Sequence, residues 1–168
     1  MLLRRTLVLT IGALLPFALT GCVKEFATDR VNTISSGVDN RDASVDVLHA
    51  VIVSSEAGSG TFIASFANND TEEPASFTTL EGIDQAQLTA EDFSPVEIPA
   101  AGLVNLATEG GVPVKGDFEA GNFVPVSVQF DNGEQVQMEI PVVTNCGDYE
   151  GLDEGTADCE TEHSDTSH

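Results

Sequence analysis

Two histidines close to the C-terminus are the residues of this chain that most readily suggest metal chemistry. His163 and His168 lie among the carboxylates Glu160, Glu162 and Asp165. Imidazole and carboxylate groups suit Zn(II) or Cu(II), so this stretch is a speculative metal site. The spacing fixes no ligand geometry, however, and a solvated acidic tail is the simpler interpretation. We therefore predict no cofactor, and we keep copper as the alternative.

The remaining histidine and the second methionine lie inside apolar rows. His49 falls within the alternating valines of residues 45–53, where a single histidine is more often a hydrogen-bonded core or edge residue than a ligand. Met138, between Val136 and Ile140, is typical of core filling. No Ser-His-Asp arrangement can be inferred from one histidine, and no glycine-rich phosphate loop precedes a helix. The sequence predicts a protein that is not an enzyme.

The first cysteine belongs to a different chemistry, that of a lipid anchor. Leu19-Thr20-Gly21-Cys22 matches a bacterial lipobox, in which the sulfur receives a diacylglyceryl group and cleavage leaves Cys22 as the first residue. The apolar run 7–19 is too short to span a bilayer and follows Arg4 and Arg5, so residues 1–21 read as a signal peptide, exported by the Sec or the twin-arginine route. We expect an extracytoplasmic lipoprotein on the outer face of the cell membrane, held by fatty acids such as palmitate.

Two cysteines remain in what this predicts to be an oxidising compartment. Cys146 and Cys159 are most simply a disulfide. A two-cysteine copper or zinc site is the alternative, although the spacing matches no familiar set of ligands.

The charge is strongly acidic. The formal net charge is −22, with 28 acids, and beyond residue 21 the only strong bases are Lys24, Arg30, Arg41 and Lys115. Nucleic acid and anionic lipid headgroups both need a basic face, so we expect neither of them as a partner. Two interpretations of the acidity stay open: solubility in salty surroundings, and a docking face for an unknown envelope protein.

The pattern along the chain predicts three segments after the signal peptide. Residues 22–43 read as the lipidated cysteine and a flexible tether, 44–143 as a β-sandwich domain, and 144–168 as an acidic, largely disordered tail around the disulfide. Short strands with turn signals between them, and no helical period, predict an all-β Greek-key β-sandwich, immunoglobulin-like in its strand spacing. The strands are expected near residues 45–53, 61–67, 75–80, 93–98, 103–106, 112–114, 124–130 and 136–142, with a single helical turn at 85–88.

Within this domain, side-chain patterns make three detailed predictions. The row of the first strand, Val45 to Val53 including His49, is expected to face one side of a sheet. Most of the phenylalanines are expected in the core, namely Phe62, Phe66, Phe77, Phe93, Phe118, Phe123 and Phe130. Pro125, which has no N–H to donate, predicts that its strand lies at a sheet edge or is bulged.

The last hairpin allows its register to be predicted. A two-residue Asn132-Gly133 turn would set the two apolar rows on opposite faces of the sheet. A three-residue loop, 131–133, with Gly133 left-handed, instead pairs Val128 with Val136 and Val126 with Met138. We predict the three-residue loop.

The order of several motifs resembles a known family. These are Phe66-Ala67-Asn68-Asn69, then Val96-Glu97-Ile98-Pro99-Ala100-Ala101-Gly102, then Gly110-Gly111, and then the hairpin 124–143 with Phe130-Asp131-Asn132-Gly133 at its tip. Together they resemble the PCu(A)C periplasmic copper chaperones over residues 44–143, and most closely the LpqE-like lipoproteins of high-GC Gram-positive bacteria. The resemblance implies a cupredoxin-like β-sandwich.

The resemblance also implies where copper would bind. In that family a histidine and methionines hold Cu(I), including an H-x-M pair just after the Gly-Gly turn, and such soft ligands suit that ion. Here Val112-Pro113-Val114-Lys115 follows Gly110-Gly111, and no H-x-M occurs in the chain. We therefore predict a lipid-anchored interaction module on this scaffold. The alternative is a copper or other metal carrier that uses different ligands, with His163 and His168 as donors.

Overall fold

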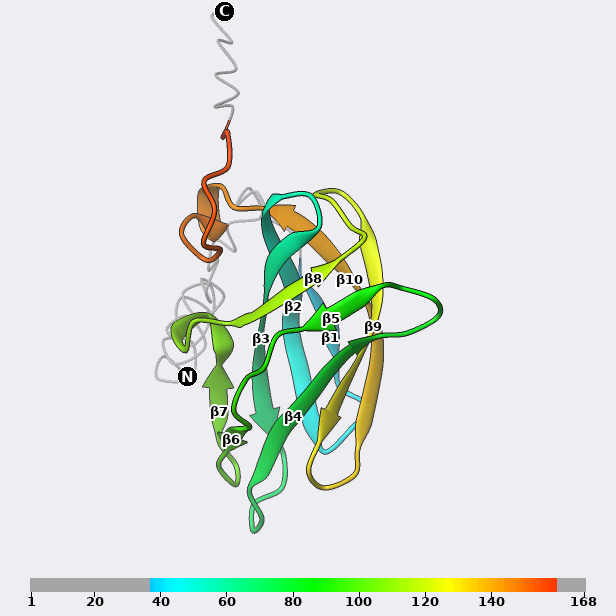
Figure 1. The fold of residues 1–168 in the computed structure, drawn as a ribbon. Helices are drawn as coiled ribbons and strands as arrows, with labels where there is room; N and C mark the ends of the chain where they lie inside the picture. Colours follow the sequence, from blue (N-terminus) through cyan, green and yellow to red (C-terminus); the bar gives the residue numbers. More distant parts are fainter. Residues whose placement is uncertain (1–36, 160–168) are drawn as a thin grey trace, which may run out of the picture. The chain divides into compact units, whose positions relative to one another are not determined.

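The computed structural model describes residues 37–159, which form an all-β domain with no α-helix among them (Figure 1). Its strands are β1 (Val38–Asn40), β2 (Val45–Glu56), β3 (Ser59–Asn68), β4 (Ala75–Gly82), β5 (Leu88–Ala90), β6 (Val96–Ile98), β7 (Leu103–Asn105), β8 (Val112–Gly116), β9 (Phe123–Phe130) and β10 (Gln135–Thr144). Between residues 37 and 159 the chain also forms two short 3-10 helices, η2 (Leu106–Thr108) and η3 (Gly147–Tyr149). The predicted signal peptide, the predicted lipidation site Cys22, and the two tail histidines, His163 and His168, lie outside the described residues.

The strands close on themselves. Their hydrogen-bonded order is β1-β2-β10-β9-β4-β5-β8-β3-β7. Because β3 also pairs with β2, the path from β2 through β10, β9, β4, β5, β8 and β3 returns to β2. Only the β2–β10 pairing is parallel. In Figure 1, β4 and β9 lie across the interior from β2 and β3. The predicted all-β sandwich is confirmed, in a form that is also a flattened barrel.

Phenylalanines fill the interior. Phe62, Phe66 and Phe77 are fully buried, and Phe118 and Phe130 are 4% exposed. Phe93 is partly buried against this cluster. Phe123 departs from the prediction because it is 64% exposed at the first residue of β9.

A β-bulge in β2 corrects the predicted face of the first strand. The register against β3 shifts between Leu48 and Val51, and His49 has a φ of +53°. Val45 and Val47 point into the main core, whereas Val51 and Val53 lie in a separate cluster with Ile63. An extra residue in a strand exchanges the two faces beyond it, so the row that the sequence placed on one side is divided between two.

The β9–β10 hairpin has the predicted register. Val128 lies opposite Val136 and Val126 opposite Met138. The Phe130 N–H donates to Glu134 O at 3.0 Å, and Gly133 has a φ of +85°. The three-residue loop is therefore confirmed.

Pro125 corrects a second prediction, that its strand is an edge strand or is bulged. Strand β9 lies between β10 and β4, and its register with β10 runs through the pair of Pro125 with Glu139 without a shift. The β4 ladder ends at the pair of Gly82 with Val126, one residue short of Pro125. The missing N–H of the proline therefore interrupts no ladder hydrogen bond to β4.

Two local elements also differ from the sequence prediction. Residues 38–40, expected in the tether, pair with β2 as strand β1, so the folded domain begins before residue 44. The expected helical turn at 85–88 is instead a tight turn in which the Ala86 N–H donates to Ile83 O at 2.9 Å. Its central residues, Asp84 and Gln85, both have positive φ, which is the geometry of a type I′ turn.

Candidate functional site

The strand that follows Gly110-Gly111 carries no metal ligand. Val112 and Val114 on β8 are each 1% exposed and belong to the main core. Pro113, which lies between the two valines, and Lys115, which follows them, face solvent. The ammonium of Lys115 lies 2.8 Å from the carboxylate of Glu91, and this contact raises the pKa of the lysine. The position where the resemblance implies H-x-M is thus occupied by two core side chains and an ion pair.

An open acidic groove of about 370 Å³ lies beside this strand. It is formed by β3, β8 and the segment after β10, and its walls carry four carboxylates, those of Glu56, Glu91, Asp153 and Glu154. Lys115 is the one base in the groove, and Glu91 already neutralises it. The groove therefore presents a surplus of negative charge.

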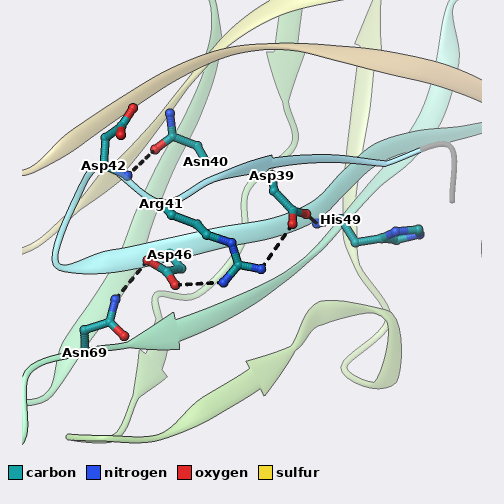
Figure 2. A network of polar contacts seen from close by, with 7 residues as sticks. All are labelled: Asp39, Asn40, Arg41, Asp42, Asp46, His49 and Asn69. Atoms are coloured by element: carbon teal, nitrogen blue, oxygen red, sulfur yellow. Dashed lines mark hydrogen bonds and ion pairs between the residues drawn. The ribbon is translucent and has the colours of Figure 1, made fainter. Parts of the chain in front are cut away.

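His49 is held by two neighbours that the sequence did not suggest, and Figure 2 shows the first of them, Asp39. The backbone N–H of His49 donates to Asp39 Oδ1 at 2.8 Å, and the ring atom Nε2 lies 3.1 Å from the hydroxyl of Tyr149. The two aromatic rings stack with centroids 6.0 Å apart. The hydrogen bond from His49 N–H lowers the pKa of Asp39, and Arg41 acts in the same direction. His49 is a half-buried, hydrogen-bonded residue, in agreement with the simpler interpretation of the sequence.

Arg41 closes the polar network around β1 in Figure 2. Its guanidinium contacts Asp39 Oδ2 at 3.2 Å and Asp46 Oδ2 at 3.4 Å. The amide of Asn69 donates to the other oxygen of Asp46 at 2.9 Å. Residues 37–159 contain only two strong bases, and both are paired with acids in this way. Both bases therefore already have acidic neighbours within the domain.

The loop before β2 is tied to the tip of the last hairpin. The carboxylate of Glu134 accepts hydrogen bonds from the N–H and the hydroxyl of Ser44, and from the amide of Asn132 at 3.1 Å. The bond from the Ser44 hydroxyl is the main reason why the pKa of Glu134 is lowered. This contact gives the Asp131–Gly133 loop a structural role beyond its turn.

Met138 is a core residue, as the sequence suggested. It is 8% exposed and lies opposite Val126.

Within residues 37–159, no group of three or more His, Cys, Asp or Glu side chains is arranged to hold a metal ion. The same part of the chain has no helix long and apolar enough to cross a membrane.

Cys146 and Cys159 are joined by a disulfide, with their Cα atoms 5.7 Å apart. Between them, the chain packs on the outer surface of β2 and β3 through Tyr149, Leu152 and Asp153. The amino-acid sequence suggests no role for Asp153 or Asn145. The only signal for them is their closeness to the cysteines along the chain.

Comparison with known proteins identifies the fold. No family model and no curated protein match the chain by sequence. Among solved structures, the apo PCuAC domain from PmoF1 has a TM-score of 0.50 and 16% identity, over 64% of this chain and 99% of that one. The apo PmoF2 PCuAC domain has a TM-score of 0.52 and 10% identity, over 66% and 98%. A copper-bound PCuAC domain from PmoF2 has a TM-score of 0.49 and 14% identity, over 64% and 98%. The chain thus has the fold of PCuAC domains.

Proposed function

We propose that this chain is a lipid-anchored module of the cell envelope that binds a basic segment of another envelope protein. The observation that carries the proposal is the composition of β8 and its groove. On a PCuAC-like scaffold, the strand after Gly110-Gly111 contributes Val112 and Val114 to the core, and the neighbouring surface gathers four carboxylates. The groove is suited to a cationic peptide segment and not to Cu(I), which prefers sulfur and imidazole.

The charge distribution supports a basic partner. Arg41 and Lys115 are each engaged by acids, so the surplus carboxylates of the domain have no counter-charge of their own. A cationic segment would be attracted over roughly a Debye length, about 8–10 Å in physiological salt. Binding should therefore weaken as ionic strength rises. We assign the protein no catalytic activity.

The anchor is the second part of the proposal and rests on the lipobox. In the native host, we expect the wild-type chain to fractionate with membranes, to incorporate labelled fatty acid, and to form a chemical cross-link with its partner. Cys22→Ala is expected to lose both the label and the membrane association, because it lacks the sulfur that is acylated. A variant that keeps the label would disprove acylation at this position.

The same cross-linking experiment tests the groove with matched charge changes. The double variant Glu56→Gln/Glu154→Gln neutralises two exposed carboxylates of the groove. The control Glu72→Gln/Glu73→Gln neutralises two exposed carboxylates elsewhere. We expect the groove variant to stay at the membrane and to lose most of the adduct, and the control to keep it. Equal loss in both would attribute binding to total charge, and no loss in either would remove the groove from the proposal.

A copper carrier is the second candidate, favoured by the fold alone. It requires donors outside β8, and the tail histidines are the available ones. Anaerobic Cu(I) titration of residues 22–168, carrying Cys22→Ala, should show no tight stoichiometric binding if the first proposal is right. A variant that lacks residues 160–168 tests the tail histidines, because the deletion removes both of them and leaves Cys159 and its disulfide in place. Tight binding that this deletion abolishes would establish the carrier, and tight binding that survives it would place the ligands in the domain.

A further inference from the structure

We propose that residues 145–159 form a clasp over the outer face of β2 and β3, which the Cys146–Cys159 disulfide keeps closed and which a dithiol reductant opens. This redox-controlled clasp goes beyond the proposed function and does not depend on it. Four observations carry it: the surface that the clasp covers, its polar anchors, its lack of strand pairing, and the exposure of one cysteine.

The clasp covers an apolar surface that lies outside the main core. Val51 and Val53 are fully buried, although the bulge at His49 directs them away from the interior, and Ile63 on the neighbouring strand β3 is 4% exposed in the same cluster. Tyr149 and Leu152 of the clasp pack against them. An apolar sheet face needs a cover to be kept from water, and here the clasp supplies much of that cover.

Polar side chains fix the clasp at three points, of which the first is the Tyr149 hydroxyl, 3.1 Å from His49 Nε2. The carboxylate of Asp153 accepts hydrogen bonds from Ser55 N–H and from Thr61 Oγ1, both at 2.9 Å. The side chain of Asn145, which is 5% exposed, donates to Ser55 Oγ at 3.1 Å and to Gly155 O at 3.0 Å. Its Oδ1 accepts from Leu152 N–H at 3.2 Å. Asn145 thus binds both the sheet and the far part of the clasp.

These contacts are few, and none is part of a strand ladder. β10 ends at Thr144, and the clasp contains only η3 as regular structure. The clasp begins directly after β10, and its first residue still bonds to β2: the Asn145 N–H donates to Ser54 O at 3.2 Å. Its far end, from Gly151 to Cys159, is retained by side-chain contacts and by the disulfide. Local structure with few buried contacts opens at low free-energy cost, so the covalent bond decides how often this end leaves the sheet.

The disulfide can be reached from solvent through Cys159. Cys159 is exposed, whereas Cys146 is partly buried. A thiolate of an external dithiol attacks the Cys159 sulfur, and a mixed disulfide forms while Cys146 leaves as a thiolate. The second thiol of the reductant then displaces Cys159. The protein gains two electrons and two protons as two thiols, and the reductant ends as its own disulfide.

Amide hydrogen exchange tests the clasp on residues 22–168 with Cys22→Ala, so that the pair supplies the only thiols. The Ser55 amide reports the clasp because it donates to Asp153, and the Val128 amide in the middle of β9 reports the domain. After reduction with dithiothreitol, we expect exchange at Ser55 to rise about tenfold or more and exchange at Val128 to stay within twofold. Reoxidation should restore the original rate at Ser55.

Two results would overturn the proposal. An unchanged Ser55 rate after reduction would mean that the noncovalent contacts hold the clasp by themselves. An equal rise at Val128 would mean that the disulfide stabilises the whole domain and controls no local opening. The variant Cys146→Ser/Cys159→Ser should reproduce the reduced pattern, and Asp153→Asn in the oxidised chain should raise exchange at Ser55 by less than reduction does. If the double variant fails to fold, reduction of the wild-type pair still decides the question.

Discussion

Phe77→Ala is expected to lower the free energy of unfolding by about 3–5 kcal/mol, as measured by urea denaturation. Phe77 is fully buried on β4. Its ring centroid lies 4.9 Å from those of Phe66 and Phe93, 6.2 Å from that of Phe62 and 6.4 Å from that of Phe130. Removing it leaves a cavity bounded by four other aromatic rings, and rigid rings relax little to fill such a space.

The loss is expected to be global because Phe77 joins both sides of the barrel. It pairs across the ladder with Phe130 of β9 and Val96 of β6 and packs against the rings of β3. A domain of this size has a total stability of about 5–15 kcal/mol, so this one change removes a large share of it.

Phe123→Ala is the matched control for Phe77→Ala. The same atoms are deleted, but Phe123 is 64% exposed, so the change should stay within about 0.5 kcal/mol. Similar losses in the two variants would contradict the assignment of the core.

Local chemistry explains which parts of the fold could be predicted from sequence. The β9–β10 register depends on two apolar rows and a glycine that accepts positive φ, and all three are encoded within 20 residues. The alternation of the other strands is local in the same sense. These elements could therefore be predicted without knowing which distant residues they contact.

The bulge at His49 could not be predicted, because its cause is not local. A strict alternation of valines runs straight through it, and a positive φ is unfavourable for histidine. Tertiary contacts compensate for this unfavourable conformation. Asp39 accepts a hydrogen bond from the backbone N–H of His49, and Tyr149 contacts its ring. Gly37 lets the chain pass close to the bulge, because a Cβ at this position would lie 2.7 Å from His49 Cα. The partners come from segments that the sequence assigned to a tether and a tail.

The candidate site divides in the same way. The missing H-x-M could be seen in the residues alone, since it depends on identities within four positions. The acidic groove could not, because Glu56, Glu91 and Asp153 come from three separate parts of the chain and meet only in the fold. Acids that are spread so evenly give no sequence signal for which of them will be neighbours.

The Gly110-Gly111 turn, which the sequence marks only as a dipeptide, has two different requirements. Gly110 has a φ of +92° and Gly111 a φ of +69°, so an alanine at either position adopts an unfavourable backbone conformation. A Cβ on Gly110 would meet nothing within 4 Å. A Cβ on Gly111 would lie 2.3 Å from Thr61 Cγ2 and 3.0 Å from Phe62 O. Only Gly111 lets β3 approach the start of β8.

We therefore expect the two alanine variants to differ in urea denaturation. Gly110→Ala should cost about 1 kcal/mol, the strain of a left-handed alanine alone. Gly111→Ala should cost about 3 kcal/mol, because the new methyl group also displaces β3 or β8 where Phe62 pairs with Val112. Equal costs would mean that the close approach is relieved without loss.

A double variant separates backbone strain from overpacking at this turn. Thr61→Ser removes the Cγ2 atom that a Cβ on Gly111 would meet, and it keeps the hydroxyl that donates to Asp153. If overpacking dominates, Gly111→Ala should cost about 1 kcal/mol less in the Thr61→Ser background than in the wild type, a coupling that a double-mutant cycle measures directly. If strain at φ +69° dominates, the two costs should add. Gly110→Ala should show no coupling to Thr61→Ser in either case, because its methyl group would reach neither β3 nor any other neighbour.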